Sequence, residues 1–79
     1  MSEYKPVECA AHSLYELAVM KRQMTVVRWQ DDSGSHSATL LPIDVVTENS
    51  EEFLVVVKKE GEEPFRIRLD HILAFEQLT

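Results

Sequence analysis

An uninterrupted apolar run at residues 53–57, Phe-Leu-Val-Val-Val, constrains the fold of this chain more than any other feature. Aromatic and β-branched side chains favour extended backbone, and a run that is apolar at every position is typical of a strand buried on both faces. With five residues, the run is far shorter than the ~20 apolar residues that cross a bilayer. We therefore expect a central strand of a sheet at residues 53–57.

Several other short segments have the composition or alternation of strands, and they lie at residues 24–29, 36–41, 65–69 and 72–75. The turn-forming residues 31–34 join the first two of these segments, which predicts a hairpin. Pro42, Ile43 and Asp44 are expected to interrupt the second strand, and residues 48–50 are polar enough to form an exposed loop. The segment 65–69 alternates strictly, so its apolar side chains should point inward and its arginines outward.

One helix is expected before these strands, at about residues 13–22. Ser13 and Glu16 have the spacing of a capping box, in which the serine hydroxyl and the glutamate carboxylate satisfy amides of the first turn. The residues that share one helical face by their spacing are Leu14, Leu17, Ala18 and Lys21. Residues 4–9 are expected to be an extended entry segment, because Pro6 removes a backbone donor.

A chain of 79 residues with one helix and about five short strands predicts a single domain, residues 1–79. The fold class is α+β, mainly β: an N-terminal helix followed by a strongly bent antiparallel sheet. Closure of such a sheet removes its exposed edges, and the helix can cover the open end. The expected architecture is therefore an Sm-like small barrel.

The charge is acidic, with eight Lys and Arg against fourteen Asp and Glu and a net charge of −6. A phosphate backbone is bound through Lys and Arg, so this balance disfavours nucleic acid as a partner. An acidic surface favours the approach of a basic partner, although ordinary solubility also explains such a charge. One cysteine and the absence of a signal-like start predict a cytoplasmic protein without an internal disulfide.

No motif predicts catalysis, a cofactor or a metal site. Cys9 and His12 have the spacing of two metal ligands, but a structural zinc site needs four and no second pair follows. Ser33 and His36 contain the atoms of a nucleophile and a base, but they lie in a predicted turn without an elbow motif. We therefore expect a protein that is not an enzyme.

A local basic stripe gives the alternative interpretation, an Sm-like RNA-binding module. Arg66 and Arg68 share one face of a predicted strand, and Lys58 and Lys59 can lie on its neighbour. The stripe is expected to be neutralised by acids of the same hairpin, namely Glu60, Glu62 and Glu63. A ring-forming structural subunit is a further alternative.

Four pieces of the chain, in their order and spacing, resemble one family: Tyr4-x-Pro6-Val7-x-Cys9, Glu16-Leu17-Ala18, Glu52-Phe53-Leu54-Val55-Val56 and Arg68-Leu69-Asp70-x-Ile72-x-x-Phe75. The family is that of the Rho-binding antiterminators, the Rof-type proteins of Gram-negative bacteria. The resemblance implies an Sm-like fold, and we expect a monomer when the protein is free. It also implies inhibition of the transcription termination factor Rho, by binding its N-terminal RNA-binding region and blocking RNA loading.

The resemblance also implies contact residues in the entry segment, the helix start and a polar loop. They are Glu8, His12, Ser13, Glu16, Asp44, Glu48, Asn49 and Ser50. The family pattern has an aromatic residue and an aspartate where this chain has His12 and Ser13, whereas the Glu16 position is retained. The resemblance implies Rho as the partner, and we expect no direct binding of nucleic acid or of a membrane. An acidic protein can occupy a cationic groove as a partial mimic of phosphate, which agrees with this partner.

Overall fold

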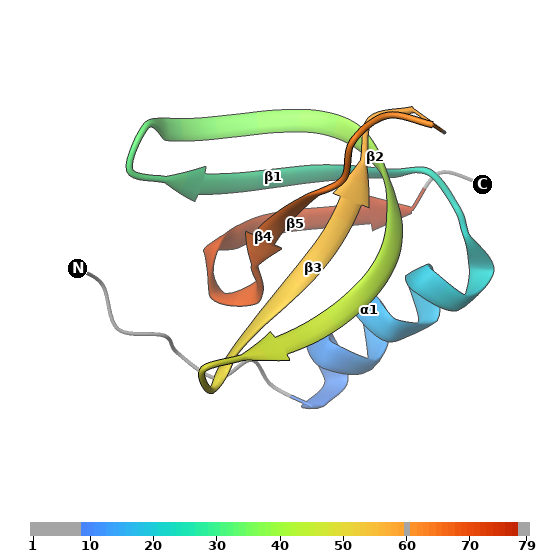
Figure 1. Cartoon of the computed structure of the whole chain (residues 1–79), viewed down its shortest axis with the longest axis horizontal. Helices are drawn as coiled ribbons and strands as arrows, with labels where there is room; N and C mark the ends of the chain where they lie inside the picture. The colour runs from blue at the N-terminus through green and yellow to red at the C-terminus, as the bar shows by residue number, and fades with distance from the viewer. Residues whose placement is uncertain (1–8, 60, 78–79) are drawn as a thin grey trace.

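The computed structural model describes residues 9–59 and 61–77, with side chains from residue 13 to residue 76 apart from residue 60. Its elements in chain order are α1 (Cys9–Lys21), β1 (Thr25–Asp31), β2 (Gly34–Glu48), β3 (Glu51–Val57), β4 (Phe65–Arg68), the 3-10 helix η1 (Leu69–His71) and β5 (Ile72–Gln77). The protein is therefore α+β and mainly β, with one helix followed by a five-stranded antiparallel sheet, as the sequence predicts (Figure 1).

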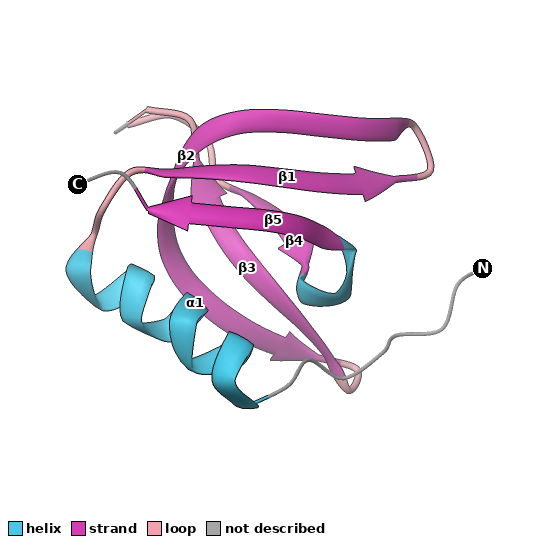
Figure 2. Ribbon diagram, turned by 180° about the vertical axis from the view of Figure 1, so that it is seen from behind, coloured by secondary structure: helices cyan, strands magenta, loops and turns pink. Residues whose placement is uncertain are grey.

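The sheet has the strand order β4-β3-β2-β1-β5. The apolar strand β3 lies between β2 and β4, which confirms its predicted interior position in the sheet. The long strand β2 curves strongly, so that its first half follows β1 and its second half follows β3 (Figures 1 and 2). β4 and β5 are the two edges of this sheet, so within the described residues the expected closure into a barrel is absent.

The predicted hairpin between the first two strands is confirmed. Asp31 pairs with Gly34, which leaves two residues in the turn. Gly34 has a φ of 120°, a value that residues with a Cβ rarely adopt. The amide of Ser33 donates to Oδ1 of Asp31 at 2.8 Å, so the aspartate closes the turn with its own side chain.

The expected interruption at Pro42, Ile43 and Asp44 is wrong, because β2 continues through these residues with a β-bulge. Pro42 pairs with Val56 and Asp44 with Val55, so Ile43 is the extra residue. A shift of one residue exchanges the two faces of a strand. Pro42 is accordingly buried before the bulge, whereas after it Asp44 is exposed and Val45 packs against the core.

The helix begins four residues earlier than predicted, at Cys9, and it ends at Lys21. Ser13 therefore lies inside the helix, and the predicted capping box is wrong. Alanine is the strongest helix former, and Ala10 and Ala11 extend the helix backward past the serine. Arg22, with a φ of 50°, terminates the helix, and its amide donates to the carbonyl oxygen of Ala18 at 3.0 Å.

The face of α1 that packs on the sheet also differs from the predicted one. Tyr15 and Ala18 are buried, and the Tyr15 ring meets the Phe75 ring of β5 edge-on, with centroids 4.8 Å apart. Leu14 and Leu17, which were expected to dock, are 41% and 43% exposed. Apolar residues lie on several sides of this helix, so spacing alone could not identify the buried side.

The core lies between the helix and the concave face of the sheet. Its buried members are Tyr15, Val27, Leu40, Leu54, Val56, Ile67 and Leu69. In β3, Leu54 and Val56 are buried on one face, and on the other face Val57 is buried whereas Val55 is half-buried. The expectation that this strand is buried on both faces is therefore confirmed only at its end. The alternation predicted for β4 is confirmed for Ile67, which is buried, and Arg66, which is exposed. Arg68, also expected to point outward, is only 15% exposed, and Leu69 falls in η1. None of the helices in the described part of the chain has the length and apolar character needed to cross a membrane.

Candidate functional site

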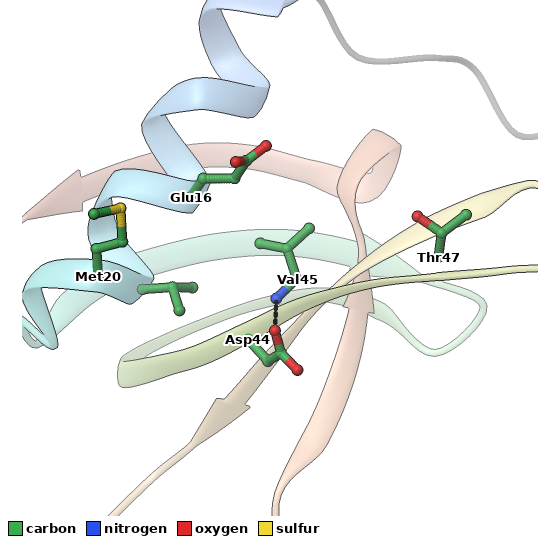
Figure 3. A pocket seen from close by; sticks show the side chains of 6 residues that line it. Glu16, Met20, Asp44, Val45 and Thr47 are labelled. Carbon is green, nitrogen blue, oxygen red and sulfur yellow. Dashed lines mark hydrogen bonds between the residues drawn. The ribbon is translucent and has the colours of Figure 1, made fainter.

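A cavity of about 370 Å³ lies between α1 and the second half of β2 (Figure 3). Its lining residues are Glu16, Val19 and Met20 from the helix and Asp44, Val45 and Thr47 from the strand. Two of these, Glu16 and Asp44, are among the contact residues expected from the sequence. The fold therefore brings two predicted residues from separate elements to the walls of one cavity.

The bulge in β2 determines how Asp44 is presented. Without the extra residue Ile43, the alternation of β2 would direct Asp44 inward, where an ionised carboxylate is costly. In the folded chain Asp44 is exposed, and its Oδ1 accepts a hydrogen bond of 2.8 Å from the backbone amide of Val45. Figure 3 shows Val45 between the Asp44 and Glu16 carboxylates, so each acid stands at its own side of the cavity.

The remaining cavity walls are mainly apolar. Val19 packs against the core, and Met20 is 79% exposed beside it. Val45 contributes a branched side chain from the strand. A lysine or arginine side chain combines an apolar stem with a cationic head, so it matches a site with apolar walls and two carboxylates. The cavity is therefore suited to accept a basic side chain of a partner.

The predicted polar loop is a two-residue turn that joins β2 to β3. Glu48 pairs with Glu51 across it, and Asn49 and Ser50 form the turn with φ values of 52° and 63°. Both residues are exposed, as predicted. In Figures 1 and 2 this turn lies at the same end of the molecule as the first turns of α1.

Glu48 forms an ion pair within the chain. Its Oε2 accepts a hydrogen bond of 2.7 Å from Nη1 of Arg66, and the Arg66 guanidinium lies 4.6 Å from the centroid of the Phe53 ring. Both side chains of this ion pair are largely exposed. A partner that contacts Glu48 must therefore compete with Arg66.

The second arginine of β4 is also paired. Nε and Nη2 of Arg68 donate to the two carboxylate oxygens of Asp70, and Nη1 lies 3.5 Å from Oε2 of Glu51. Acidic side chains thus neutralise both arginines of the basic stripe, as expected. The acids that do so are Glu48, Glu51 and Asp70, and not the loop residues Glu62 and Glu63 that were expected. The third expected partner, Glu60, lies outside the described residues.

Of the three remaining predicted site residues, only one has a described side chain. Ser13 is exposed on α1. His12 belongs to α1, but its side chain lies outside the described part, as does Glu8 altogether. Among residues 9–59 and 61–77, no group of three His, Cys, Asp or Glu side chains could hold a metal ion.

Sequence reasoning missed the exposed apolar side chains of α1, one of which, Met20, lines the cavity. Leu17 and Met20 are exposed on α1, and Leu14 lies one turn earlier. The signal that could have found them is the excess of apolar residues in α1, more than one buried face can accommodate.

A search of known protein families found no family that matches this chain, and no curated protein is significantly similar to it.

Proposed function

We propose that this protein inhibits the transcription termination factor Rho by occupying its N-terminal RNA-binding region and blocking the loading of RNA. The observation that carries the proposal is the position of Glu16 and Asp44 on one cavity between α1 and β2. Both residues are among the contacts that the resemblance to the Rof-type antiterminators implies. The proposal also includes an Sm-like architecture, which the strand order and the strongly bent β2 support.

The electrostatics favour this kind of partner. A surface that binds single-stranded RNA carries Lys and Arg side chains that track the phosphates. A protein with a net charge of −6 is attracted to such a surface, and the attraction raises the rate of encounter. We propose that an arginine or lysine of Rho enters the cavity, with its stem against Val19 and Val45 and its cationic head between the two carboxylates.

Charge alone does not give a stable complex, because exposed ion pairs contribute little net free energy. Stable interfaces have a desolvated centre built from a few well-packed side chains. Met20 is exposed on the wall of the cavity, Leu17 is exposed three residues earlier on α1, and both can supply this apolar centre. The proposed interface is therefore an apolar ridge of α1 flanked by acids.

The alternative, binding of RNA along the arginines of β4, has less support. Arg66 and Arg68 are paired with acidic side chains, so their charges are already compensated within the chain. A phosphate would have to displace these carboxylates. The Rho inhibitor is thus the function that the geometry favours.

The direct test is a binding titration of the purified protein on immobilised Rho at several ionic strengths. We expect binding at low salt, weaker binding as the salt concentration rises, and release of Rho-bound single-stranded RNA in proportion to occupancy. Light scattering of the free protein should give the mass of a monomer. Absence of binding to Rho at low salt would reject the proposal.

A further inference from the structure

A second cavity, of about 430 Å³, opens at a different part of the molecule. Its lining residues are Trp29 from β1, His36, Ser37 and Ala38 from β2, Lys58 after β3 and Phe65 at the start of β4. It shares no lining residue with the cavity between α1 and β2. The proposed binding of Rho makes no use of it.

Three aromatic rings form much of this cavity. The Trp29 and His36 rings are stacked, with centroids 5.3 Å apart and an angle of 28° between their planes. The Phe65 ring is tilted by 42° to Trp29, with a centroid distance of 6.1 Å. All three rings belong to strand residues, so the aromatic wall is held by the sheet rather than by a loop.

Two features fix the orientation of these rings. Trp29 pairs directly with His36 in the regular hairpin of β1 and β2. Directly opposed side chains of an antiparallel pair contact each other, so the pairing places the two rings together. Nε2 of His36 donates to Oδ1 of Asp31 at 2.9 Å, and this hydrogen bond holds the imidazole against the indole.

The cavity also carries one positive charge. Lys58 is exposed on its wall, and within the described part of the chain it has no ion-pair partner. Ser37 adds a hydroxyl group that can donate or accept a hydrogen bond. The lysine would repel a cationic ligand, and a purely apolar ligand would offer the Lys58 ammonium no group to bind. The combination suits a planar ring that carries a negative group.

We propose that this cavity binds a mononucleotide, with the base stacked on the aromatic wall of Trp29 and Phe65 and the phosphate held by the Lys58 ammonium. The volume lies within the range of about 300–1,000 Å³ that is usual for small-molecule sites. Base stacking on aromatic side chains tolerates different bases, so selectivity for one base is expected to be weak. A free nucleotide fits better than a strand, because the acidic chain repels a polyanion whereas one phosphate is matched by one lysine.

The test uses Trp29, the sole tryptophan of the chain, whose indole N–H gives a single resonance in an NMR titration. We expect saturable shifts with adenosine and uridine monophosphates. Lys58→Gln should weaken the affinity about three- to fivefold, as expected for loss of one exposed charge contact. Lys59→Gln is the matched control, because Lys59 is an adjacent exposed lysine that is not among the lining residues, and it should have little effect.

The nucleoside without a phosphate separates stacking from charge. It should bind the unmodified protein about three- to fivefold more weakly than the nucleotide, and Lys58→Gln should not weaken it further. A lack of saturable shifts at millimolar nucleotide, or equal effects of the two lysine variants, would overturn the proposal. Tighter binding of a short single-stranded RNA than of the mononucleotide would overturn the assignment to a free ligand. All of these outcomes are independent of whether the protein binds Rho.

Discussion

The guanidinium of Arg68 holds the carboxylate of Asp70 by two parallel hydrogen bonds, from Nε to Oδ1 at 3.0 Å and from Nη2 to Oδ2 at 2.7 Å. The two side chains are only 15% and 8% exposed. The pair joins the last residue of β4 to η1, and η1 leads directly into β5. It thus fixes the path by which the chain passes from one edge strand of the sheet to the other.

Substitution of Asp70 by Asn tests this structural role. The amide keeps the shape of the side chain but removes the nearer of the two carboxylates that compensate the largely buried Arg68, the other being Glu51 at 3.5 Å. We expect a loss of about 2–4 kcal/mol in the free energy of unfolding, near the cost of breaking a buried ion pair. Urea denaturation followed by circular dichroism measures it.

The matched control is Glu48→Gln, which breaks the pair with Arg66 on the same strand. The contact distance, 2.7 Å, is the same, but these side chains are 42% and 57% exposed. Solvent screening should limit the loss to less than about 1 kcal/mol. Equal losses in the two variants would show that burial does not determine the strength of these pairs.

Ser13→Ala tests where the helix begins. Loss of a serine cap would cost about 1 kcal/mol. Inside a helix, the same substitution replaces a weaker helix former by the strongest one and should stabilise the protein by a few tenths of a kcal/mol. Because α1 begins at Cys9, we expect stabilisation in thermal unfolding. A lower melting temperature would show that the serine caps the helix after all.

The turn between β2 and β3 can be stabilised by Ser50→Gly. Ser50 has a φ of 63°, in the left-handed region where a Cβ is unfavourable. Asn-Gly is the preferred pair for a two-residue hairpin turn of this kind. We expect a gain of about 0.5–1 kcal/mol in the free energy of unfolding, measured by urea denaturation. Ser35→Gly, in a paired position of β2, is the control and should destabilise.

Tyr15 makes the stability sensitive to alkaline pH. Burial raises the pKa of its hydroxyl above the ordinary value of 10.0, because the phenolate would be poorly solvated beside the core. The neutral Tyr15 hydroxyl therefore makes its full contribution to the free energy of unfolding below pH 10. This contribution is lost as the pH rises through the raised pKa of the folded state. Tyr15→Phe should remove this loss of stability at alkaline pH.

The measurement of the Tyr15 titration is ultraviolet difference absorbance across the alkaline range. The chain has two tyrosines, so a Tyr4→Phe variant leaves Tyr15 as the sole reporter. The midpoint should lie above 10.0, the ordinary tyrosine value. A midpoint at the ordinary value while the protein stays folded would mean that the ring is accessible to solvent.

The strands were predictable because their signals are local. Alternation at residues 65–68, the apolar run of β3 and the turn around Gly34 each depend on neighbouring residues only. The bulge at Ile43 was not predictable in this way. The bulge allows Val45 to pack into the core while Asp44 remains in solvent. Its position therefore depends on tertiary burial and not on local propensity.

The candidate site was predictable in part. The resemblance selected Glu16 and Asp44, and the fold places both on one cavity. The resemblance could not reveal that Leu17 and Met20 are exposed, because their exposure depends on which face of α1 packs on the sheet. The stacking of Trp29 on His36 was missed for a similar reason: it requires the register between β1 and β2, which the sequence does not specify alone.

Charge reversal at the cavity gives the sharpest prediction for the proposed inhibition of Rho. Glu16→Lys and Asp44→Lys each replace a carboxylate by an ammonium on the wall that is proposed to receive a basic side chain. Repulsion should weaken binding to Rho about tenfold or more for each variant, since like charges at an interface cost affinity and specificity. The effect should shrink as the salt concentration rises.

Glu62→Lys is the matched control for these reversals, because it makes the same change in net charge at an exposed residue between β3 and β4 that lines neither cavity. If only the total charge attracts Rho, all three variants should weaken binding equally. If the cavity receives a basic side chain, Glu62→Lys should change the affinity by no more than about twofold through long-range electrostatics. Equal losses in all three variants, measured on folded proteins in the same buffer, would therefore reject the cavity as the contact site while leaving an acidic inhibitor in place.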